Sequence, residues 1–236
     1  VQRLLAEAVQ EVGEVKFSAG FLLAEWEQVV DAWQLDSWES YRDVARLGRK
    51  TRLPEARRAV LWSVFERVKS SLRDHGLITQ AEMFSRLASH FARTQRPLFD
   101  FAVIDEAQDV GVAQLRFLAS LGSRRPDTLF FAGDLGQRIF QQPFSWKALG
   151  VDIRGRSWTL RVNYRTSHQI RMQADRLLAP ELADVDGNTE ERRGTVSVFN
   201  GPKPTIMVLD TQEDEIDTVG QWIRDRVGDG VVPHEI

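Results

Sequence analysis

The chain has 236 residues, of which 42% are hydrophobic and 28% charged, and its formal net charge is −3. These proportions are typical of a globular protein with one large or two smaller domains, and they exclude the strongly basic composition of a chain that binds nucleic acid by charge alone. The absence of cysteine excludes disulfides and thiolate metal sites. No apolar run approaches the ~20 residues of a membrane span, and no N-terminal signal is present, so we expect a cytoplasmic protein without a membrane partner.

The N-terminal part, residues 1–95, is predicted to be helical. A helix is expected over Glu55–Arg73, where an apolar residue recurs at every fourth position, namely Ala56, Val60, Val64, Val68 and Leu72. A second helix is expected over Ala81–Arg93, with Thr79 as its N-cap and Glu82 three residues further on. Four tryptophans are expected in the helical core: Trp26, Trp33, Trp38 and Trp62.

After Pro97 the pattern changes to short apolar strands that alternate with helices, which predicts an α/β fold with a parallel sheet. The expected strands are 99–104, 127–132, 157–160, 195–199 and 205–209. Helices are expected around Leu115–Ala119, over 167–178 and over Glu213–Val227. A domain boundary is predicted near residues 150–160.

The segment Phe99–Asp109, FDFAVIDEAQD, carries the first motif. Its apolar run predicts a buried parallel strand, and the run ends in Asp105 and Glu106, with Asp109 close behind. Ligands of open α/β sheets bind beyond the carboxyl ends of such strands. Carboxylates at that position can hold Mg²⁺ and orient an attacking water.

The second motif covers residues 132–140, AGDLGQRIF, and follows the next predicted strand. Gly133 and Gly136 bracket an acidic residue, which suits a tight turn that brings Gln137 close to a ligand. An amide can contact a terminal phosphate without charge repulsion. Phe140 and Trp146 offer faces for base stacking, or they anchor the loop as buried aromatic residues.

The third motif covers residues 160–167, LRVNYRTS. Arg165 precedes a predicted helix whose N-cap is Thr166 or Ser167, so its guanidinium can clamp a phosphate, although arginines at helix starts are commonly surface charges. Tyr164 beside it can stack on a nucleobase.

In their order and spacing, the three motifs resemble motifs II, III and IV of the UvrD/Rep branch of superfamily 1 DNA helicases, over about residues 75–178. The resemblance implies part of a RecA-like P-loop NTPase sheet with a large helical insertion and the start of a second RecA-like domain. Residues 1–95 would be the helical 1B-like subdomain, 96–156 the C-terminal part of the first RecA-like domain, and 157–236 the start of the second. The implied activity is ATP-dependent 3′→5′ movement on single-stranded DNA or on DNA with a 3′ tail; protein partners are not specified.

The resemblance also implies a role for each motif residue. Asp105 would coordinate Mg²⁺, with Glu106 beside it as a second candidate ligand and as the general base on the hydrolytic water. Gln137 would sense the γ-phosphate of ATP, Tyr164 would stack on adenine, and Arg165 would reach the γ-phosphate. The residues expected to face single-stranded DNA are Phe140 and Trp146, and those expected to orient the other groups are Gln108, Asp109 and Asp134.

The sequence contains no GxxxxGKS or GxxxxGKT phosphate loop; the nearest string, at residues 47–51, lacks the first glycine and follows a helical stretch. The family's phosphate loop lies upstream of its helical insertion. We therefore expect an internal fragment of a longer helicase, with ATP and Mg²⁺ as cofactors of the full-length protein and weak ATP binding by the fragment. Two alternatives stay open: a non-catalytic helicase-like module that binds single-stranded DNA or a protein, and the motor part of a helicase–nuclease.

Overall fold

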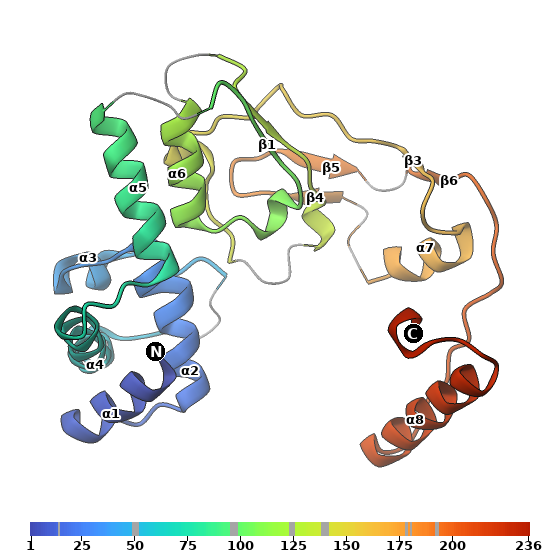
Figure 1. The fold of residues 1–236 in the computed structure, drawn as a ribbon, viewed down its shortest axis with the longest axis horizontal. Coiled ribbons are helices and arrows are strands. Elements are labelled where there is room, and N and C mark those ends of the chain that lie inside the picture. Colours follow the sequence, from blue (N-terminus) through green and yellow to red (C-terminus); the bar gives the residue numbers. More distant parts are fainter. Residues whose placement is uncertain are drawn as a thin grey trace. The chain divides into compact units, whose positions relative to one another are not determined.

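The computed structural model describes residues 1–13, 15–48, 52–94, 99–122, 126–137, 142–177, 179, 181–191 and 194–236. The chain is mixed α/β and divides into two compact units (Figure 1). The first contains Val1–Leu160 and Leu178–Gly194, and the second contains Arg161–Leu177 and Thr195–Ile236. Over the described ranges, no helix combines the length and the apolar character that crossing a membrane requires.

In the residues that the structure describes, the first unit begins with helices alone, as predicted. They are α1 (Gln2–Val12), α2 (Ala19–Glu25), the π-helix η1 (Trp26–Asp31), α3 (Trp38–Asp43), α4 (Glu55–Asp74) and α5 (Gln80–Thr94). Most of these helices share one hydrophobic core, which contains Trp26 and Trp62, and Trp38 packs against it. Trp33 instead packs against a second cluster around Val112 and Leu115. Two tryptophans therefore lie in the predicted helical core, a third lies at its edge, and the fourth contacts the α/β part.

The apolar face of α4 differs from the predicted stripe. Val64, Val68 and Leu72 are buried, but Ala56 is exposed and Val60 is 37% exposed. Positions four apart in a helix of 3.6 residues per turn advance by about 40° at each step, so a long stripe at this spacing leaves the buried face. The helix instead buries Leu61 and Phe65, which lie on the same side as Val68.

Helix α5 has the predicted start and links the helical part to the α/β part. Thr79 Oγ1 accepts a hydrogen bond of 3.1 Å from the backbone N–H of Glu82, as an N-cap does. The helix packs along α6 (Val112–Gly122), where the Phe117 ring lies 5.5 Å from Phe84 and 6.0 Å from Phe91. The cap and this aromatic contact set the position of α5 in the first unit.

The α/β part contains two short strands, β1 (Ala102–Ile104) and β2 (Leu129–Phe131), with α6 between them in the chain. They pair in parallel as predicted, with Val103 opposite Phe130. The prediction of a buried strand is wrong for one face, because Val103 is 75% and Phe130 63% exposed. Only the opposite face of β2, with Leu129 and Phe131, packs on the second cluster. The described residues of this part also form the 3₁₀ turns η2 (Ala107–Asp109), η3 (Leu135–Gln137) and η4 (Lys147–Leu149).

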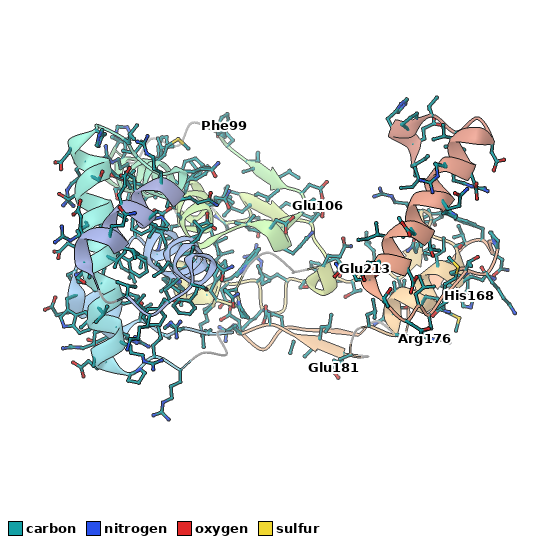
Figure 2. The ribbon with its side chains drawn as sticks, turned by 90° about the horizontal axis from the view of Figure 1, so that it is seen from below. Phe99, Glu106, His168, Arg176, Glu181 and Glu213 are labelled. Atoms are coloured by element: carbon teal, nitrogen blue, oxygen red, sulfur yellow. The ribbon has the colours of Figure 1, made fainter. Side chains whose placement is uncertain are left out.

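The second unit contains β3 (Val162–Asn163) and β6 (Val196–Ser197), which pair in parallel. The helices are α7 (His168–Asp175) and α8 (Gln212–Gly228), followed by the 3₁₀ turn η5 (Pro233–Glu235). Figure 2 labels His168 at the start of α7. The strands expected at 157–160 and 205–209 are absent from these two fully described segments, where Leu160 is 90% and Val208 93% exposed. An apolar run becomes a strand only where a neighbouring strand accepts its backbone hydrogen bonds.

A hairpin that the sequence analysis missed joins the first unit. Strands β4 (Glu181–Ala183) and β5 (Thr189–Glu191) pair antiparallel, and Figure 2 labels Glu181 at the start of the hairpin. Between the strands, Asp186-Gly187 is a common hairpin signal that would have revealed the turn. The hairpin belongs to the first unit, although the chain on both sides of it belongs to the second.

Candidate functional site

The acidic motif forms a tight turn directly after β1, and Figure 2 labels Glu106 there. Asp105 Oδ1 accepts a hydrogen bond of 2.9 Å from the backbone N–H of Glu106. Glu106 has φ 51° and ψ 44°, a left-handed conformation that residues other than glycine seldom adopt. Such a conformation costs on the order of 1–3 kcal/mol and persists only where surrounding contacts enforce it.

Gln108 supplies one of those contacts. Its side chain is 7% exposed, and its Nε2 donates a hydrogen bond of 2.6 Å to Glu106 Oε2. The carbonyl oxygen of the same amide accepts a hydrogen bond of 3.1 Å from the backbone N–H of Asp134. Gln108 therefore joins the carboxylate that follows β1 to the loop that follows β2.

Gly133 makes room for this bridge. A Cβ atom at this position would lie 2.6 Å from Gln108 Oε1 and 3.1 Å from the backbone nitrogen of Ala107. Distances below 3.0 Å are shorter than real Cβ contacts, so the amide would have to shift. The glycine of the second motif is therefore needed for the close approach between the two motifs at Gln108.

The loop after β2 is held by its own acidic residue. Asp134 Oδ1 accepts from the backbone N–H of Gly136 at 2.7 Å, and Oδ2 accepts from Gln137 Nε2 at 3.0 Å. An amide nitrogen carries two donor hydrogens, and this bond uses one of them. Gln137 is exposed, so its amide lies at the surface. The loop that carries it is the one that Gln108 joins to the acidic turn.

Metal binding at this edge would depend on the carboxylates of the acidic motif. No group of three or more histidine or acidic side chains in the described part of the chain is arranged to hold a metal ion. Mg²⁺ does not need such a cage, because it usually retains waters and binds one or two carboxylates together with substrate phosphates. The donor chemistry of Asp105 and Glu106 suits Mg²⁺ in that mode.

Trp146, expected to face DNA, has one side of its indole packed on the strand end. Its ring centroid lies 4.8 Å from that of Phe131 at an interplanar angle of 67°. The side chain is half-buried and belongs to the edge of the second hydrophobic cluster. This contact anchors the ring, and the DNA-facing role of Trp146 stays a prediction. Phe140, its expected companion, lies outside the described residues.

Tyr164 and Arg165 lie in the second unit. Asn163 Oδ1 accepts from the backbone N–H groups of Arg165 and Thr166, both at 2.9 Å. Ser167 occupies the N-cap position of α7, but its side chain makes no capping hydrogen bond. Tyr164 is 75% exposed and Arg165 is exposed, so both side chains are accessible on a turn that Asn163 holds.

Comparison with protein-family models finds no match, and a search of curated proteins also finds no significant match.

Proposed function

We propose that this chain forms part of the ATP-hydrolysing motor of a UvrD/Rep-type superfamily 1 DNA helicase that moves 3′→5′ on single-stranded DNA. The support comes from three motifs in the family's order and from the βαβ arrangement of β1, α6 and β2, which suits a RecA-like sheet. The observation that carries the proposal is the Gln108 bridge, because it joins the two motifs that would handle the nucleotide.

The geometry suits hydrolysis of a terminal phosphate. Asp105 would hold Mg²⁺, which when bound neutralises phosphate charge. Glu106 would take a proton from the attacking water, and the hydrogen bond from Gln108 holds its carboxylate in one orientation. Gln137 would contact the γ-phosphate through its neutral amide. Arg165 would stabilise the charge that develops on that phosphate.

The remaining roles concern the base and the strand. Tyr164, exposed beside Arg165, would stack on adenine. Trp146 would stack on a base of single-stranded DNA, together with Phe140. Base stacking on an aromatic ring contributes about 1–3 kcal/mol and is tolerant of sequence, as movement along DNA requires.

The deciding experiment uses the full-length protein. In Glu106→Gln, DNA-stimulated ATP hydrolysis should fall by about 10²- to 10⁴-fold, the usual contribution of a general base. Binding of a fluorescent ATP analogue should be retained, because the substitution keeps the size and hydrogen-bonding capacity of the side chain. The control is Glu7→Gln, which removes an exposed carboxylate of α1 that pairs with Arg3 at 3.4 Å.

Three outcomes separate this proposal from its alternatives. Hydrolysis by Glu106→Gln at the wild-type rate rejects the general-base role. A wild-type protein that binds single-stranded DNA but hydrolyses no ATP is a non-catalytic module, and the proposal then fails. If the reading frame continues into a nuclease domain, the proposed motor role stands and the protein is a helicase–nuclease.

A further inference from the structure

The carboxylate of Asp186 in the hairpin β4–β5 contacts the turn that carries Trp146. Asp186, in the hairpin loop, accepts a hydrogen bond from the Ser145 hydroxyl and another of 3.0 Å from the backbone N–H of Lys147. Ser145 Oγ in turn accepts from the backbone N–H of Ala148 at 2.9 Å. One side chain that lies about forty residues further along the chain therefore caps the start of η4.

The hairpin loop holds Asp186 in a defined position. Asp184 Oδ1 accepts from the backbone N–H groups of Asp186 at 2.9 Å and Asn188 at 2.8 Å, and Asp184 Oδ2 accepts from Asn188 Nδ2 at 2.7 Å. Gly187 has φ 83°, which suits glycine in a tight turn. Because Asp184 organises the loop from within, Asp186 remains available for the neighbouring segment.

Trp146 lies between the two residues that Asp186 binds. Its ring packs on Phe131 at the end of β2, while Asp186 of the hairpin binds the Ser145 hydroxyl before it and the Lys147 backbone N–H after it. Its carbonyl also accepts from the backbone N–H groups of Leu149 and Val151, both at 3.0 Å. The orientation of the indole therefore depends on the ring contact and on the backbone of the turn.

We propose that Asp186 is a positioning residue for Trp146: the hairpin holds the tryptophan-bearing turn in the orientation in which the indole meets single-stranded DNA. This inference rests on the proposed function for its DNA-binding consequence. The hairpin belongs to the first unit, although in sequence it lies between the two segments of the second unit. The inference gives the hairpin a role in the first unit. Hydrogen bonds to an ionised acceptor are roughly twice as strong as neutral ones, so a carboxylate is suited to holding the turn in one position.

The electrostatic environment agrees with this geometry. Burial pushes the pKa of Asp186 upward, but hydrogen bonds from the Ser145 hydroxyl and from the backbone N–H groups of Lys147 and Trp146 outweigh it, so the pKa lies below its ordinary value. The folded protein thus favours the ionised form, which is the form that can accept from all these donors.

The first experiment observes Trp146 in the chain labelled with 5-fluorotryptophan, by ¹⁹F NMR. Trp146→Phe assigns its resonance among the seven tryptophans. Asp186→Ala should shift or broaden that resonance, while the resonance of Trp158, which is 84% exposed, should stay in place. Asp186→Asn keeps one acceptor oxygen and should give an intermediate change. The control, Glu7→Ala, removes an exposed carboxylate of α1 that pairs with Arg3. An unshifted Trp146 resonance in Asp186→Ala overturns the inference.

The second experiment measures the affinity of the full-length protein for fluorescent single-stranded DNA by anisotropy. Trp146→Ala should weaken binding by about 5- to 150-fold, the equivalent of one stacked base. Asp186→Ala should weaken it in the same direction, and the double variant should bind no more weakly than Trp146→Ala. Additive losses overturn the inference, because they show that Asp186 acts elsewhere. Should Trp146→Ala itself bind normally, the DNA role in the proposed function fails, and the NMR result decides the positioning separately.

Discussion

Gln108 and Glu106 are two residues apart in sequence and are joined by a hydrogen bond of 2.6 Å between Nε2 and Oε2. The other end of the same amide accepts from the backbone of Asp134, so the orientation of the carboxylate is tied to the loop that carries Gln137. A displacement of that loop, for example on phosphate contact at Gln137, would therefore act on the carboxylate through one buried side chain.

Removal of the Gln108 amide should destabilise the chain. Gln108→Leu leaves the Asp134 N–H without its acceptor and Glu106 without its donor, which should lower the free energy of unfolding by about 1–3 kcal/mol. Gln108→Glu keeps an acceptor for Asp134 but places a negative charge beside Glu106, so it should also destabilise. Urea denaturation followed by circular dichroism measures both changes. Gln221→Leu, on exposed α8, is the control, and a Gln108→Leu variant as stable as this control would contradict the bridge.

Gly133 should not tolerate a methyl group. The Cβ atom of Gly133→Ala would meet Gln108 Oε1 at 2.6 Å and the backbone of Ala107 at 3.1 Å, so the bridge must shift, at a cost of about 1–3 kcal/mol. The matched control is Gly20→Ala in α2, where no atom lies within 4 Å and alanine favours the helix by up to about 1 kcal/mol. Thermal or urea unfolding of both variants provides the comparison. Equal stability of the two would show that the loop after β2 lies further from Gln108.

Removing the cation of the buried ion pair in the helical core should lower the stability of the protein. The side chains of Arg46 and Glu25 are 5% and 0% exposed, and Nη2 lies 2.6 Å from Oε2. The Tyr41 hydroxyl also donates to Glu25, at 3.0 Å. Arg46→Ala leaves a buried carboxylate without its charge partner, which should cost about 3–5 kcal/mol of unfolding free energy.

Two comparisons test the ion-pair prediction. The double variant Glu25→Gln/Arg46→Met should be more stable than Arg46→Ala alone, because no uncompensated charge is left in the core. Arg42→Ala, which disrupts the exposed pair with Asp43, should leave stability almost unchanged. A loss in Arg46→Ala no greater than that in Arg42→Ala would show that water reaches Glu25.

Asp31 should make stability depend on pH. Its Oδ1 accepts from the Thr79 hydroxyl at 2.6 Å and from Gln34 Nε2 at 2.7 Å, but burial outweighs these bonds and raises its pKa. The nearby charges of Glu82 and Lys69 act in opposite directions. The folded state therefore binds a proton more readily than the unfolded state. Above its folded pKa, the ionised carboxylate lowers the free energy of unfolding, and this loss disappears as pH falls from the folded pKa toward the unfolded pKa.

The variant Asp31→Asn keeps an acceptor oxygen and removes the charge. At pH 7 it should be as stable as the wild type or more stable, and any advantage should shrink as pH falls toward the unfolded pKa of about 4. Urea denaturation at pH 7, 6 and 5 measures this trend, with Asp36→Asn, an exposed aspartate, as the control. A variant that is less stable than the wild type at pH 7, by a margin that narrows on acidification, would show that the charged form is favoured.

Local patterns were sufficient to predict the features that neighbouring residues create. The start of α5 at Thr79 follows from a hydroxyl three residues before a backbone N–H. The parallel pairing of β1 and β2 joins residues 27 positions apart, but the order strand–helix–strand was enough to predict it. Features that depend on distant partners were harder to predict. The strand expected at 157–160 lies instead at Val162–Asn163, because β6 provides hydrogen-bond partners there.

The sequence by itself determined the helical N-terminal part, the alternation that follows it, and the residue types at the two strand ends, because each depends on contacts within a few positions. Only the tertiary structure decided which side chains meet. It brought Gln108 between Glu106 and Asp134, left Val103 exposed, and brought Asp186 to the turn of Trp146. The contacts of Gln108 with Asp134 and of Asp186 with Lys147 join segments 26 and 39 residues apart in the chain, and such contacts form only when the packing of whole elements brings the segments together.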